Sequence, residues 1–225
     1  MASSAVDTEV NQDRKALIIE KAAELFASRG IAATTVRAIG DAAGILSGSL
    51  YHYFGSKNAI VDEILAGFLD DLTARYDAVL KESTNAIAQV RGLVHASLDC
   101  MAAHPHAAEI YQNDANYLLT APRYEYVGKG AASVRRSWLR VLEAGVANGT
   151  FRNDVPTWLM YHLLRDAIWL TVRWFEPSSR YSYAELADDC CNIFLKGFVA
   201  PGVDVDAGAG AGEGAGAPPP PKSNR

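Results

Sequence analysis

The chain has 225 residues, of which 49% are hydrophobic and 21% charged, and these ordinary globular values allow one large domain or two small ones. Its net charge of −5 argues against non-specific nucleic-acid binding, and no apolar run reaches the roughly eighteen residues that a membrane helix needs. The N-terminus lacks the apolar core of a signal peptide, and the three cysteines (Cys100, Cys190 and Cys191) lack metal-ligand spacing, so we expect a cytoplasmic protein with packing cysteines.

The first predicted helix covers residues 12–29. Its apolar residues recur at helical spacing: Leu17, Ile18, Ala22, Leu25 and Phe26. Gly30 follows and is expected to end the helix. Residues 1–11 precede this pattern, and we expect them to form a disordered arm.

Residues 34–57, TTVRAIGDAAGILSGSLYHYFGSK, have the pattern of two short helices joined by a tight turn. Thr34 or Thr35 can cap the first helix. Gly44 stands where that helix must stop, because glycine enters the left-handed backbone region at the least cost. The pattern predicts a helix-turn-helix.

The second of these helices is predicted over residues 48–54. Ser47 is expected to cap it, and Ile45 and Leu46 are expected to point back to the core. Its first residues are small and polar, Gly48 and Ser49, and a slim polar end can enter the major groove of DNA.

The charge distribution supports a DNA-facing surface at this end of the chain. Residues 11–57 carry a net charge of +2, whereas residues 58–225 carry −5. The asymmetry favours the N-terminal part as the face that approaches phosphate.

The remaining chain is predicted to be helical almost throughout. Ser56 can cap a long helix with apolar residues at every fourth position, and further helices are predicted at 85–103, 106–120, 123–147, 155–176 and 182–199. Ser182 and Glu185 form a capping-box pattern at the start of the last. No segment alternates with period two, so we expect an all-α fold. The Gly-, Ala- and Pro-rich residues 201–225 are expected to be disordered.

The run GIAATTVRAIGDAAGILSGSLYHYFGSKNAIVDEIL resembles the DNA-binding domain of TetR-family repressors, with Gly40 where the family pattern has alanine. The resemblance implies a helix-turn-helix domain over residues 12–72 and a helical effector-binding and dimerisation domain over residues 73–200. It also implies a homodimer, formed through the last two helices, that binds palindromic double-stranded operator DNA.

The resemblance assigns the DNA-binding residues to the helix-turn-helix. Phosphate contacts are expected from Thr35, Ser47, Tyr53 and Lys57, and base-edge or groove contacts from Gly48, Ser49, Tyr51 and His52, with Arg37 as a further DNA-binding residue. The alternative is a plain helical hairpin whose core contains Leu50, Tyr53 and Phe54.

Three further runs carry a closer resemblance: YQNDANYLL, WLRVLEAGVANGTFRNDV and RDAIWLTVRW. They resemble an actinobacterial branch of the TetR family, the Kst-type repressors. These repressors control the later steps of cholesterol catabolism, in which the last two sterol rings are degraded. This resemblance implies an acyl-CoA effector, the CoA thioester of an indanedione propanoate, and it implies no cofactor.

The candidate effector residues lie mainly in the predicted helix 155–176. Arg165, Trp169 and Arg173 are four residues apart and would share one helix face among apolar positions. Periodicity leaves two interpretations open: an arginine pairs with Asp166 or another carboxylate at a dimer interface, or an anionic ligand supplies the missing charge. The resemblance favours the ligand. Tyr111 and Gln112 are further candidates for the effector site, and the sequence does not decide whether they line it.

Three alternatives differ from this interpretation. The first is a TetR-type regulator that responds to another acyl-CoA or to an apolar acid or drug. The second is an acyl-CoA enzyme, and the third is an architectural DNA-binding protein without an effector. No nucleophile–base pair, metal-ligand set or glycine-rich phosphate loop supports an enzyme. The His104-Pro105-His106 step is expected to be a helix junction and not a metal site.

Overall fold

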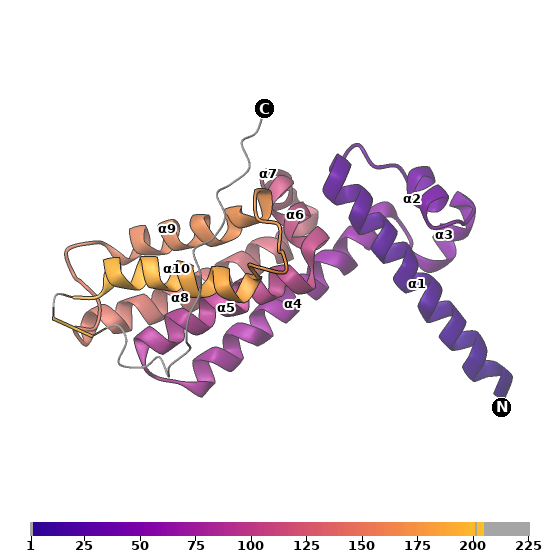
Figure 1. Ribbon diagram of the computed structural model, residues 1–225. Helices are drawn as coiled ribbons and strands as arrows, with labels where there is room; N and C mark the ends of the chain where they lie inside the picture. Colours follow the sequence, from indigo (N-terminus) through magenta and orange to yellow (C-terminus); the bar gives the residue numbers. More distant parts are fainter. Residues whose placement is uncertain (1, 201, 205–225) are drawn as a thin grey trace. The chain divides into compact units, whose positions relative to one another are not determined.

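The computed structural model describes residues 2–200 and 202–204, and the side chains from residue 11 onward (Figure 1). The described chain consists of α1 (Ala2–Arg29), α2 (Val36–Ala42), α3 (Ser47–Tyr53), α4 (Lys57–Glu82), α5 (Ala86–Ala103), α6 (Pro105–Asn113), α7 (Ala115–Thr120), η1 (Pro122–Tyr124), α8 (Glu125–Ala147), α9 (Thr157–Trp169), η2 (Leu170–Arg173) and α10 (Tyr183–Phe198). It contains isolated β-bridges but no named strand, so the all-α prediction is confirmed. None of its helices is long and apolar enough to cross a membrane. The predicted disordered tail lies outside the described residues, except for 202–204.

The described residues divide into two compact units. The first unit contains residues 2–73 and 103–133, and the second contains residues 74–102 and 134–204. The first break lies next to the predicted domain boundary at 72 and 73. Residues 103–133, which we expected in the effector domain, belong to the first unit because α6 packs against α1.

Helix α1 places an apolar stripe in the core of the first unit. Ile18, Ala22 and Phe26 have no exposed surface, as the spacing of four predicts. The backbone of residues 2–11, predicted to be a disordered arm, continues α1 instead. No glycine or proline interrupts residues 2–11, so the helix can extend from its packed part toward the N-terminus.

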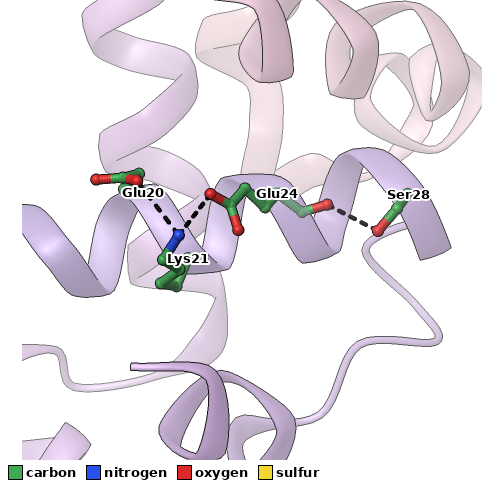
Figure 2. A network of polar contacts seen from close by, with 4 residues as sticks. All are labelled: Glu20, Lys21, Glu24 and Ser28. Atoms are coloured by element: carbon green, nitrogen blue, oxygen red, sulfur yellow. Dashed lines mark hydrogen bonds and ion pairs between the residues drawn. The ribbon is translucent and has the colours of Figure 1, made fainter. Parts of the chain in front are cut away.

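The outer face of α1 carries a short polar network, shown in Figure 2. Lys21 Nζ lies 2.7 Å from Glu24 Oε1 and 3.3 Å from Glu20 Oε1, and these hydrogen bonds, the Glu24 bond first, raise the pKa of the lysine. Ser28 Oγ donates to the backbone oxygen of Glu24 at 2.7 Å. The helix ends directly afterward at Gly30, as predicted, and the backbone of Gly30 has a positive φ, +83°.

The second unit is a helical bundle built on a buried hydrogen-bond chain. Trp138 Nε1 donates to Tyr76 Oη at 2.9 Å, and Tyr76 Oη lies 2.6 Å from Ser97 Oγ, which donates to the backbone oxygen of Leu93 at 2.7 Å. All three side chains are essentially buried, and burial raises the pKa of Tyr76. The chain connects α4, α8 and α5 through satisfied polar groups.

The loop after α8 is fixed to the end of α10. Phe151 is buried, pairs with Val199 in an isolated antiparallel bridge, and donates its N–H to the Gly145 oxygen at 2.9 Å. Figure 1 shows α10 running beside α9. The predicted capping box at its start is confirmed, because Ser182 and Glu185 exchange both hydrogen bonds.

Two predicted helices are interrupted. The helix predicted at 106–120 is divided at Asp114, which ends α6 and precedes α7. The helix predicted at 155–176 ends at Trp169 and becomes the 3-10 turn η2, where Thr171 Oγ1 donates to the Ile168 oxygen at 2.6 Å. A threonine hydroxyl that donates to a backbone carbonyl of the helix competes with the backbone N–H groups for that oxygen.

The cysteines occupy packing positions, as expected. Cys100 and Cys191 are buried and Cys190 is partly buried, and none forms a disulfide. Burial raises the pKa of Cys191 to about 12, so its thiol is a poor nucleophile at neutral pH.

Candidate nucleic-acid interface

Helix α2 begins with a hydrogen-bonded cap. Thr35 Oγ1 accepts the Ala38 N–H at 3.1 Å, which confirms the predicted capping role of Thr35. Thr35 and Arg37 are exposed. The Arg37 guanidinium makes only a loose ion pair, with its Nε 3.8 Å from Asp41 Oδ2. Both side chains are therefore available to a phosphate backbone.

The turn between α2 and α3 is held close to α2. Gly44 has φ +65°, as predicted, and Ile45 N donates to the Gly40 oxygen at 2.9 Å. A Cβ on Gly40 would lie 3.0 Å from the Ile45 oxygen and 3.3 Å from Ser47 N. Glycine at position 40, where the family pattern has alanine, thus allows the backbones of α2 and the turn to approach closely.

Two predictions for the turn are wrong. Leu46, expected to point to the core, is the N-cap residue of α3 and its side chain is 80% exposed. Ser47, expected to cap, is instead the first helical residue, and α3 has no side-chain cap. Ile45 is partly buried, so only one of the two apolar residues can turn inward from this tight backbone.

Helix α3 separates a buried face from an exposed one. Leu50 is fully buried and Phe54, just after the helix, is 4% exposed. The remaining candidate residues are outward-facing or partly buried: Ser47, Gly48, Tyr51 and His52 are exposed, and Ser49 and Tyr53 are half-buried. This arrangement places hydroxyl, imidazole and phenol groups on an accessible face, where they can donate to phosphate or to base edges.

Lys57 has a structural role that its sequence position did not reveal. Its Nζ donates to the Ile31 oxygen at 2.7 Å and to the Thr34 oxygen at 2.8 Å, which fixes the loop between α1 and α2. An ammonium has three donors, so one remains for the predicted phosphate contact. Ser56 Oγ accepts the Ala59 N–H and caps α4, as predicted.

The same loop is also held by Asp114, the residue between α6 and α7, and by a hydrogen bond within the loop. Asp114 Oδ2 accepts the Ile31 N–H at 3.3 Å, and Thr34 Oγ1 donates to the Gly30 oxygen at 2.9 Å. Asp114 was not predicted, because the residues that it joins are separated by more than eighty positions. The available signal was the polar run Gln112-Asn113-Asp114 within the predicted helix.

The candidate effector residues occur in both units. Arg165 Nε and Nη2 both donate to Asp166 Oδ1, at 2.8 and 2.6 Å, and its guanidinium lies 5.9 Å from the centre of the Tyr161 ring. Burial raises the pKa of Tyr161, and the nearby Arg165 opposes that shift. Trp169 is 5% exposed, whereas Arg173 is exposed.

The three residues do not share one helix face, because α9 ends at Trp169 and Arg173 belongs to η2. Arg165 and Trp169 keep the spacing of four on α9. The pairing of Arg165 with Asp166, which we considered at the sequence level, is present, and the effector role of the three residues stays a prediction.

Tyr111 and Gln112 lie on α6 in the first unit, and both are half-buried. Tyr111 packs against Phe68 with ring centres 5.8 Å apart. The first unit also contains an open cavity of about 370 Å³, lined by Asp62, Ala66, Arg123 and Tyr126. None of these lining residues was a candidate.

Comparison with known proteins identifies the family. The model of bacterial regulatory proteins of the tetR family matches residues 18–64, and the model of the tetracyclin repressor-like C-terminal domain matches residues 83–198. The chain is 42% identical to the HTH-type transcriptional repressor KstR2 of Rhodococcus jostii, over 87% of this chain and 96% of that protein. Identity to KstR2 of Mycobacterium tuberculosis is 40%, over 84% of this chain and 95% of that protein.

The structure of the ketosteroid transcriptional regulator KstR2 of Mycobacterium tuberculosis is similar, with a TM-score of 0.80 and 40% identity, over 83% of this chain and 95% of that chain. These relatives are transcriptional regulators, which excludes the acyl-CoA enzyme alternative. The chain belongs to the TetR family of bacterial regulatory proteins.

Proposed function

We propose that this protein is a homodimeric repressor of steroid-catabolic genes that a CoA thioester of a steroid-ring fragment releases from its operator. The observation that carries the proposal is the 42% identity to a KstR2 repressor, which extends over the DNA-binding and the C-terminal parts of the chain. A closely packed α2–turn–α3 segment with an exposed polar face supports operator binding.

An apolar surface on α9 and α10 supports the dimer. Four large hydrophobic side chains of this region are exposed: Trp158 (54%), Leu163 (53%), Leu170 (38%) and Ile193 (72%). Large apolar side chains that stay exposed on helices in contact with each other favour an interaction site. A two-fold pair of chains would present two copies of α3 to half-sites related by the same symmetry.

Arg165 supports an anionic effector. Both of its hydrogen bonds go to one oxygen of Asp166, and the side chain is 41% exposed, so further N–H groups of the guanidinium remain for a carboxylate or phosphate. The Trp169 indole lies one turn further along α9 and is buried in the apolar interior of the second unit, where the apolar part of an effector would contact it. The effector would favour release through its differential affinity for the two states of the dimer, typically about 1–3 kcal/mol of coupling.

An operator mobility-shift assay tests the proposal. The CoA thioester of an indanedione propanoate should release the DNA, and the free acid should release it poorly. Arg165→Met and Trp169→Ala should keep operator binding and lose the response, whereas Arg180→Met, an exposed arginine outside α9, should respond normally. Equal release by thioester and acid would refute the CoA component, and a full response in both α9 variants would refute the site. Release by a different acyl-CoA or by an apolar drug would favour the alternative regulator.

A further inference from the structure

Leu46 is the most exposed large hydrophobic side chain of the described residues, at 80%. It lies in the turn between α2 and α3, with φ −64° and ψ 138°, and its backbone oxygen accepts the Ser49 N–H at 2.9 Å. The backbone of the residue is therefore fixed, and its side chain projects into solvent beside the face of α3 that carries the DNA-binding candidates.

Leucine is a poor choice for this position on grounds of stability. N-cap positions favour Ser, Thr, Asp or Asn, whose side chains accept an orphan N–H of the first turn, and α3 lacks such a bond. Solvent exposure also forgoes the free energy that a buried leucine would contribute. Two unfavourable features at one residue of a DNA-reading element indicate that the leucine contacts something outside the chain.

The surrounding backbone prevents Leu46 from turning inward. A Cβ on Gly40 would lie 3.0 Å from the Ile45 oxygen, so α2 and the turn that carries Leu46 already approach each other closely. On the other side the turn is open: a Cβ on Gly44 or Gly48 would meet no atom within 4 Å. The residues two positions before and two positions after Leu46 are therefore open to solvent, like the Leu46 side chain itself.

We infer that Leu46 determines operator specificity by contacting the 5-methyl group of a thymine in each half-site. This inference rests on the proposed binding of an operator through α3. A leucine side chain has no hydrogen-bonding group, and thymine is the one unmodified base that presents a methyl group in the major groove. Leu46 therefore distinguishes thymine from cytosine by an apolar contact, next to polar residues that read donors and acceptors.

The test uses DNA in which only the methyl group changes. The full chain first selects its operator from random duplexes, and each thymine of the selected site is then replaced by uracil and each cytosine by 5-methylcytosine. We expect one thymine in each half-site at which uracil weakens binding about fourfold, the equivalent of one buried methyl-sized group. At a cytosine introduced there, 5-methylation should restore affinity.

Three variants assign the effect to Leu46. Leu46→Ala should bind the thymine and uracil duplexes equally, and Leu46→Met, which retains an apolar side chain, should keep the preference for thymine. Leu119→Ala removes an exposed leucine of α7 and should behave as the unaltered chain. An undiminished uracil penalty in Leu46→Ala, or no penalty at any position in the unaltered chain, overturns the inference while operator binding stands. Failure to select any sequence overturns both.

Discussion

Replacing Lys57 by methionine separates two roles of one ammonium group. Methionine keeps an apolar stem of similar length and removes all three N–H donors. Two of these donors hold the Ile31 and Thr34 oxygens, at 2.7 and 2.8 Å, and the third is free for phosphate. The variant therefore tests the loop and the DNA contact at once.

The two roles predict independent magnitudes. A hydrogen bond from a charged donor contributes about 1.5–3 kcal/mol. Because Lys57 is half-exposed, we expect only the lower figure for both bonds together, a loss of about 1.5 kcal/mol of unfolding free energy. Loss of one phosphate contact in each half of a dimer should reduce the salt slope of log affinity by about 1.8. Affinity should fall for all DNA sequences alike, because phosphate contacts carry no sequence information.

Urea unfolding and a salt titration of operator binding measure these quantities. Arg37→Gln is the matched control, since its exposed side chain is 3.8 Å from its only described partner, and we expect a smaller salt slope with less than about 0.5 kcal/mol lost stability. An unchanged salt slope in Lys57→Met would refute the phosphate contact. Unchanged stability would refute the role assigned to the two loop bonds.

Two further predictions concern the second unit. Tyr76→Phe leaves the buried Trp138 N–H without its acceptor, and urea unfolding should show a loss of about 2–3 kcal/mol of stability. The control is Tyr181→Phe, which should cost far less because the Tyr181 hydroxyl bonds Asp189 on the surface. Equal losses in the two variants would contradict the role of the buried chain of hydrogen bonds. Gly145→Ala should destabilise the protein by about 1–3 kcal/mol, because the new Cβ would lie 2.2 Å from the Phe151 ring. This loss is expected although alanine is the better helix former. A raised melting temperature would show that the ring moves aside freely.

Local chemistry made the helix-turn-helix largely predictable. The cap at Thr35 and the positive φ of Gly44 depend on atoms a few residues away, so the residue types indicate them directly. Leu46 was predicted wrongly because an apolar residue beside a helical pattern usually points inward, and the tight approach at Gly40 that prevents it is a tertiary feature.

The candidate effector face shows where periodicity fails. Spacing of four residues assumes a continuous helix, but the Thr171 hydroxyl bonds a helical carbonyl and α9 ends before Arg173. Likewise, no local pattern indicates that residues 103–133 pack with the first unit, because the Asp114 contact with Ile31 joins segments distant in sequence.

The burial of the indoles in the second unit has a spectroscopic consequence. Trp138 and Trp169 are at most 5% exposed, whereas Trp158 and Trp174 are more than half exposed. The four tryptophans of the chain therefore divide into a class that emits at short wavelength and resists aqueous quenchers and a class that emits at long wavelength and is quenched readily. Intrinsic fluorescence can therefore report a change in the exposure of the buried indoles of this unit, without a label and without DNA.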